Sequence, residues 1–326
     1  MSKADLKVAL RALARAQAEG ETPDFGRFEL GVWSRAVAKL VQQGNMERAA
    51  FAVRRMHEAS PAFEWAANMD RLFRLMPPAD PGAPPFTHDP EAAVQIVRRP
   101  GAETALLVFC GVGHQAGMPL PMLHRWLVRW PVSLIYLCDL NALGYLGGLE
   151  PLGADRAATV ESLRRTVGEL GAKRMVCCGP SIGGYGALRY SLELGAAATV
   201  LFSGITNMDP DFNVGLHYAR MALKLQGTFP GEILDLKELC LAAADPPTVF
   251  AAYAQHNWDD RLHAEHLADV EGVVTIQMRG AKSHNTIVEM IQGGQFDDFI
   301  RNALTADAPT HGMGGVRGPL DEVIRA

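Results

Sequence analysis

The chain has 326 residues, of which 48% are hydrophobic and 21% are charged, and its formal net charge at pH 7 is -5. This apolar fraction excludes a disordered or fibrous protein, and the length allows two domains with sizeable buried cores. No long run of consecutive Lys or Arg is present, so we expect no nucleic-acid partner.

Neither an export signal nor a membrane span is expected. The first seven residues carry charges where a secretory signal needs an apolar run. The longest segment without a charged side chain, residues 104–124, contains three glycines and two prolines, which a spanning helix does not favour. The five cysteines lack metal-type spacing and lie mostly in apolar runs: Cys110, Cys138, Cys177, Cys178 and Cys240. We therefore expect reduced, buried thiols in a cytoplasmic protein.

Residues 1–76 have the apolar periodicity of helices. Leu6, Leu10 and Leu13 share one face of a first predicted helix, and Trp33 begins the apolar face of a second predicted helix. The sequence therefore predicts a small all-α domain at the start of the chain.

Part of this region resembles a tetratricopeptide repeat. Trp33, Gly44, Ala49 and Pro61 stand at the offsets of one such helical hairpin. The resemblance implies a module that binds a protein partner or a second copy of the chain. A helical cap packed on the larger domain is favoured over such a binding module, because a lone repeat must bury its faces against something else.

Residues 77–86 contain five prolines and predict a linker. From residue 87 to 304, apolar strands alternate with amphipathic helices, among them a helix over residues 155–170 that Asp155 can cap. This alternation predicts an α/β fold with a mostly parallel sheet covered by helices on both faces. We expect the first two strands to form an antiparallel hairpin, and residues 305–326 to form a flexible tail. The expected strands are Val94–Val97, Ala105–Cys110, Val132–Leu137, Met175–Cys178, Thr199–Phe202, Val249–Tyr253 and Val273–Met278.

A glycine-rich turn stands between a predicted strand and a predicted helix. The segment from Gly179 to Gly184 is Gly-Pro-Ser-Ile-Gly-Gly. Small residues two before and two after Ser181 allow strand and helix to approach closely, which places the serine hydroxyl at the tip of a strained turn. The segment lacks the Lys-Ser/Thr ending of a phosphate-binding P-loop. A serine nucleophile is therefore favoured over a phosphate-binding turn.

This segment resembles the nucleophile elbow of esterases in the α/β-hydrolase superfamily. The resemblance implies the α/β-hydrolase fold, with Ser181 as nucleophile and an acid and a histidine following in the order Ser, Asp, His. It places the general base on the loop after the last strand, where His284 lies. For the acid, Asp260 is preferred and Asp259 is the alternative, because both follow the strand ending at Tyr253.

The resemblance also implies an oxyanion hole built from two backbone N–H groups. One is that of Ile182, directly after the nucleophile. The other belongs to the loop after the second strand, at Val112 or, alternatively, Gly113. Cys110 stands where the family often has a histidine, which leaves the backbone donor in place.

Residues 205–247 form an insertion that is too long for a simple strand–helix–strand connection. It is predicted to form a lid over the nucleophile, with a pair of packing helices as the alternative. His263 and His266, beside the two aspartates, have a spacing that can place two imidazoles on one helical face, but no clear third ligand stands at helical distance, so no metal site is predicted.

These features predict a serine hydrolase that cleaves an ester, thioester or amide of a small-molecule acyl substrate, most simply as a carboxylesterase, without a cofactor or metal. Two alternatives use the same features. One is an acyltransferase with the same triad, and the other is a catalytically silent scaffold that binds a protein through residues 1–76.

Overall fold

The computed structural model describes residues 3–306. The chain divides into two compact units: Met1–Pro90 with Met118–Trp130 form unit 1, and Glu91–Gly117 with Pro131–Ala326 form unit 2. Residues 307–326, which make up most of the predicted flexible tail, lie outside the described residues.

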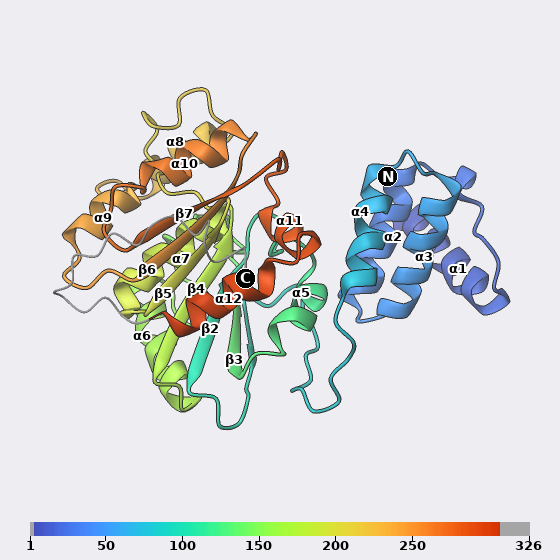
Figure 1. The fold of residues 1–326 in the computed structure, drawn as a ribbon, viewed down its shortest axis with the longest axis horizontal. Coiled ribbons are helices and arrows are strands. Elements are labelled where there is room, and N and C mark those ends of the chain that lie inside the picture. The colour runs from blue at the N-terminus through green and yellow to red at the C-terminus, as the bar shows by residue number, and fades with distance from the viewer. Residues whose placement is uncertain (1–2, 307–326) are drawn as a thin grey trace. The chain divides into compact units, whose positions relative to one another are not determined.

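Unit 1 is helical, as predicted (Figure 1). Trp33 is fully buried at its centre, and its indole N–H donates to the carbonyl of Phe25 at 3.1 Å. Gly44 takes a positive φ of 74° in the turn between two helices, and Asn45 caps the second of them. The likeness to a tetratricopeptide repeat stays a prediction. The helices of unit 1 are α1 (Lys3–Glu19), the short 3₁₀ helix η1 (Phe25–Arg27), α2 (Leu30–Gln42), α3 (Met46–Ala59), α4 (Glu64–Leu75) and α5 (Leu120–Leu127).

The proline-rich segment 77–86 forms neither helix nor strand. It is tied to α5, because the Arg125 guanidinium donates to the carbonyl of Pro77 at 2.8 and 3.3 Å. The Phe86 ring packs against His124 with ring centroids 4.7 Å apart. The segment is thus part of unit 1, and its role as a linker stays a prediction.

Unit 2 is built on a seven-stranded sheet in the order β1-β3-β2-β4-β5-β6-β7. All neighbouring strands pair in parallel except β1 and β3. The predicted mostly parallel sheet is therefore confirmed. The strands are β1 (Val94–Val97), β2 (Thr104–Phe109), β3 (Val132–Leu137), β4 (Arg174–Pro180), β5 (Ala198–Phe202), β6 (Thr248–Ala254) and β7 (Val273–Met278).

The predicted hairpin of β1 and β2 is wrong. β1 pairs with β3, with Val94 opposite Leu137, while both edges of β2 are occupied by the parallel strands β3 and β4. The apolar β2 gains more from two buried parallel neighbours than from an edge hairpin. The connection 98–103 permits this arrangement, because six residues span up to about 20 Å and strands lie only about 5 Å apart.

Helices cover both faces of the sheet. Alternate strand residues face opposite sides, so Leu201 packs in a cluster with Leu188 of α7. The neighbouring Phe202 lies on the other face, against Phe299 of α12, and Figure 1 shows α12 crossing the sheet on that side. Asp155 caps α6 by accepting from the N–H of Ala158 at 2.8 Å, as predicted. The helices are α6 (Arg156–Glu169), α7 (Ile182–Leu194), α8 (Ala219–Thr228), α9 (Leu236–Ala242), α10 (Trp258–His266), α11 (Thr286–Gln292) and α12 (Phe296–Thr305).

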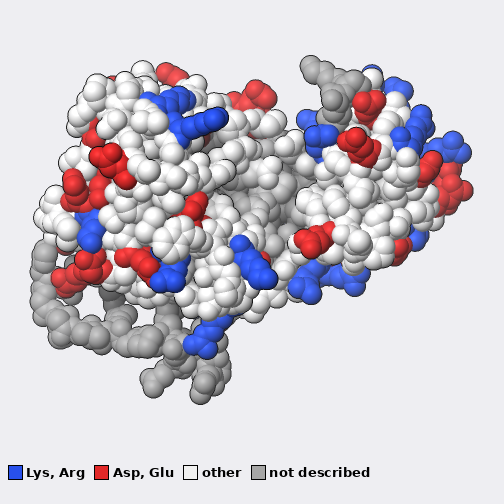
Figure 2. Space-filling model, turned by 90° about the horizontal axis from the view of Figure 1, so that it is seen from above, with Lys and Arg blue, Asp and Glu red and all other residues white. Residues whose placement is uncertain are grey.

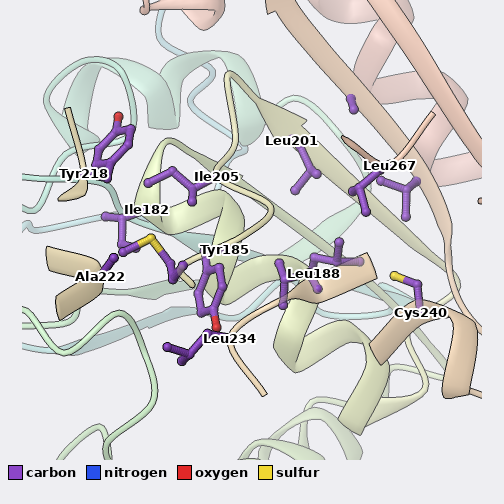
Figure 3. Packing of buried hydrophobic residues seen from close by; sticks show 14 of the residues in the cluster. Ile182, Tyr185, Leu188, Leu201, Ile205, Tyr218, Ala222, Leu234, Cys240 and Leu267 are labelled. Carbon is purple, nitrogen blue, oxygen red and sulfur yellow. The ribbon is translucent and has the colours of Figure 1, made fainter. Parts of the chain in front are cut away.

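The insertion 205–247 carries α8 and α9 and packs beside α7. The buried guanidinium of Arg189 on α7 pairs with Glu232 and donates to the carbonyl of Ile233 at 2.6 Å. One apolar cluster joins the insertion to α7 (Figure 3), and it includes Ile182, Tyr185, Leu188, Ile205, Met208, Tyr218, Ala222, Leu225, Leu234 and Leu236.

None of the described helices is long and apolar enough to cross a membrane. On the face shown in Figure 2, basic and acidic side chains are interspersed. All five cysteines are free and buried, and the sulfur atoms of Cys110 and Cys138 lie 3.1 Å apart at the ends of β2 and β3.

Candidate active site

Ser181 lies at the tip of a sharp turn between β4 and α7. Its backbone has φ 54° and ψ -128°, a conformation that a residue with a side chain rarely adopts. The N–H of Ser181 donates to the carbonyl of Phe202, and the carbonyl of Ser181 accepts from the N–H of Ile205, both at 3.1 Å. The strained turn is therefore held by β5 and by the start of the insertion.

Glycines on either side of Ser181 make this turn possible. A Cβ atom on Gly179 would lie 2.4 Å from the carbonyl oxygen of Gly183, and one on Gly183 would lie 2.3 Å from that of Phe109. Real Cβ atoms do not approach backbone so closely. The two glycines thus allow α7 to start directly against β4 and the end of β2.

Two backbone segments border the serine where an oxyanion donor is predicted. Ile182 is the first residue of α7, so its N–H has no intrahelical acceptor. The loop after β2 is closed by the N–H of Gly111, which donates to the carbonyl of Gln115 at 2.7 Å. A Cβ atom on Gly111 would lie 3.2 Å from the carbonyl oxygen of Pro180, so this loop lies against the turn. The donor role of Val112, or of Gly113, stays a prediction.

His284 and Asp260 come together from two segments that are far apart in the sequence, one a loop and the other a helix. The Nδ1 atom of His284, between β7 and α11, lies 2.5 Å from Oδ1 of Asp260 on α10. Asp260 is only 2% exposed, and the Ser203 hydroxyl donates to its Oδ2 at 2.7 Å. Both carboxylate oxygens are therefore satisfied, which compensates for burial of the acid.

Asp259 has a different partner. Its Oδ2 accepts from the backbone N–H of His217 in the insertion at 3.3 Å. Of the two predicted acids, the structure therefore brings Asp260 to His284 and leaves Asp259 to hold the insertion. This split follows from helix geometry, because consecutive residues on α10 point about 100° apart.

Tyr218 stands between the nucleophile and the base. Its hydroxyl oxygen lies 3.0 Å from Oγ of Ser181 and 3.0 Å from Nε2 of His284. Within the described residues, no hydrogen bond joins Ser181 to His284 directly. Burial raises the pKa of Tyr218 above its ordinary value, so the phenol keeps its proton at neutral pH.

Two polar residues of this site, Tyr218 and Ser203, are not among the residues that the sequence predicts. No local pattern in the sequence marks Tyr218, because it lies 37 residues from Ser181 and 66 from His284. Ser203 does carry a signal, since it directly follows β5 at the carboxyl edge of the sheet, where polar residues often serve a site.

His263 and His266 are used within unit 2. The ring of His266 pairs with Asp235 at 2.8 Å. His263 is 2% exposed, and its Nδ1 accepts from the N–H of Thr206 at 3.3 Å. Burial lowers the pKa of His263 to about 4, which keeps it neutral at pH 7. Among residues 3–306, no group of three or more His, Cys, Asp or Glu is arranged to hold a metal ion.

The strand order and the serine turn together define the fold. A mostly parallel sheet with a serine on a sharp strand-to-helix turn, followed along the chain by an acid and a histidine at the same sheet edge, is the arrangement of the α/β-hydrolase fold. The chain has this fold, as its resemblance predicts.

No family model matches the chain, and no curated protein matches it. Solved structures similar to it include esterase B from Lactobacillus rhamnosis, at 13% identity over 78% of this chain and 94% of that one, with a TM-score of 0.47. An ester hydrolase from the metagenome of Lake Arreo is 16% identical over 94% of this chain and 98% of that one, with a TM-score of 0.44. An S-formylglutathione hydrolase from Agrobacterium tumefaciens is 16% identical over 66% of this chain and 94% of that one, with a TM-score of 0.40.

Proposed function

We propose that the protein is a serine hydrolase that cleaves an ester, thioester or amide of a small acyl substrate, with carboxylesterase-type activity as the simplest case. The observation that supports this most is the convergence of three elements on one sheet edge. Ser181 stands at the tip of its strained turn, and His284 is held by the buried Asp260 at 2.5 Å.

In this mechanism Ser181 attacks the acyl carbon and forms an acyl-enzyme, which water then hydrolyses. His284 is the general base and Asp260 fixes its tautomer, because a carboxylate accepts only from Nδ1–H and leaves Nε2 free to take a proton. The N–H groups of Ile182 and of Val112, or alternatively Gly113, stabilise the oxyanion. Each such donor is typically worth on the order of 10²–10³ in rate.

A fluorophosphonate probe tests the proposal. It is expected to label the wild-type protein and not the Ser181→Ala variant, and mass spectrometry of the labelled protein should place the adduct on Ser181. Hydrolysis of p-nitrophenyl esters of increasing chain length then defines the acyl group. Equal labelling of both proteins, or labelling of neither, contradicts the proposal.

A further inference from the structure

The nucleophile and the base of the proposed enzyme are bridged by a third side chain. The Tyr218 hydroxyl lies 3.0 Å from both Ser181 Oγ and His284 Nε2. Each distance is suitable for a hydrogen bond between the groups concerned. A substrate-bound serine can therefore pass its proton to the histidine only through this phenol, unless Tyr218 first moves away.

The direction of the hydrogen bonds follows from the buried acid. The Asp260 carboxylate accepts from His284 Nδ1–H, so Nε2 of the neutral imidazole carries the free lone pair. Tyr218 must then donate its single proton to Nε2. The Tyr218 oxygen is left to accept from the Ser181 hydroxyl. Both hydrogen bonds are therefore donated in the direction from the serine to the histidine.

Tyr218 is held firmly in this place. The residue is only 7% exposed, and its carbonyl accepts from the N–H of Ala222 at 2.9 Å in the first turn of α8. The preceding residue, His217, is tied to Asp259 on α10. Figure 3 shows the Tyr218 ring beside Ile182 in the apolar cluster, with its hydroxyl pointing away from the other labelled side chains.

We propose that Tyr218 is a catalytic residue that relays the proton between Ser181 and His284. This inference rests on the proposed hydrolase function. As Ser181 Oγ bonds to the acyl carbon, its proton passes to the Tyr218 oxygen and the phenol proton passes to His284 Nε2. When the leaving group departs, it takes the phenol proton, and His284 Nε2–H restores it. Tyr218 is neutral before and after each step, so protons and charges balance.

The relay is tested with the Tyr218→Phe variant, which removes only the hydroxyl. Tyr185→Phe is the matched control, because Tyr185 is a buried tyrosine of the same apolar cluster and its hydroxyl makes no hydrogen bond to Ser181 or His284. The rate of fluorophosphonate labelling is measured for both variants and the wild type, with thermal melting as a check on folding. The wild-type labelling rate is also measured in mixtures of H2O and D2O, because its dependence on the deuterium fraction gives the number of protons transferred in the rate-limiting step.

Tyr218→Phe is expected to label on the order of 10²–10⁴ times more slowly than wild type, whereas Tyr185→Phe labels at nearly the wild-type rate. A plot of the wild-type labelling rate against the deuterium fraction of the solvent should be curved, which indicates that two protons are transferred in the rate-limiting step. A Tyr218→Phe variant that melts like wild type and is labelled as fast as wild type or faster overturns the relay. Tyr218 then only blocks access to Ser181. A straight line for the wild type, which indicates one proton, overturns the relay as well. If the wild type itself is not labelled at Ser181, it is the hydrolase proposal that fails.

Discussion

The two carboxylate oxygens of Asp260 have different partners. One accepts from His284 and the other from the Ser203 hydroxyl. Asp259, the next residue back, meets only a backbone N–H of the insertion among the hydrogen bonds of the described chain. At the scale of single residues, the two adjacent acids are therefore chemically distinct.

This difference predicts a large loss of activity for one of two isosteric variants and a small change for the other. Asp260→Asn is expected to lower kcat for an ester substrate by a factor on the order of 10³–10⁴, because an amide can present the wrong hydrogen-bonding group to His284 Nδ1. Asp259→Asn keeps an acceptor for the His217 N–H and should change kcat only a few-fold. Steady-state hydrolysis of the best p-nitrophenyl ester checks both. A larger loss in Asp259→Asn would contradict the pairing seen here.

The sequence predicts Ser181 and His284 more directly than it predicts the acid or Tyr218. Ser181 and His284 are marked by local context, namely a glycine-rich turn after one strand and a loop after another. The choice between Asp259 and Asp260 depends on the rotation of α10, which no spacing specifies. Tyr218 depends on how α8 packs on α7, so it becomes visible only in three dimensions.

At the scale of elements, the tight contact of α7 with the end of β2 depends on Gly183. Its missing side chain leaves room for the carbonyl of Phe109, which a Cβ would approach to 2.3 Å. We expect Gly183→Ala to lower the free energy of unfolding by more than about 2 kcal/mol, because rigid backbone must shift. Urea unfolding measures this change.

Gly168→Ala provides the control, since it makes the same substitution in α6, where a Cβ would meet nothing within 4 Å. Alanine is the better helix former by up to about 1 kcal/mol, so this variant should be as stable as wild type or more stable. If both variants were equally stable, the close approach at Gly183 would be refuted.

The strands and their direction follow from composition, but their neighbours do not. Runs that are apolar at nearly every position, such as Val132–Leu137, indicate a strand buried on both faces, and all seven are found. The pairing of β1 with β3 instead of β2 is decided by competition for edges across the whole sheet. Such competition is non-local, so the short connection between β1 and β2 does not reveal which strands pair.

At the scale of the whole molecule, each unit has among its described residues one buried histidine that resists protonation. His124 on α5 of unit 1 and His263 on α10 of unit 2 both have their pKa lowered to about 4, chiefly by burial. An unfolded histidine takes up its proton near pH 6.5. Between these values the unfolded state binds more protons, so stability that is present above pH 6.5 is lost as the pH falls towards 4.

Each histidine is expected to remove up to about 3 kcal/mol of stability over this range. Urea unfolding at pH 7 and at pH 4.5 measures the loss in wild type and in His124→Phe and His263→Phe, which keep an aromatic ring but cannot titrate. Each variant should lose less stability than wild type on acidification. An undiminished loss in both would show that other groups cause the acid sensitivity.

The two units also differ in which side chains can report on them. All five cysteines are buried in unit 2, whereas Trp33, Trp65, Trp126 and Trp130 belong to unit 1 and only the exposed Trp258 belongs to unit 2. The rate of thiol labelling therefore reports on the unfolding of unit 2, and tryptophan fluorescence reports mainly on unit 1. The native sequence thus provides a separate probe for each of its two units, without any engineered residue.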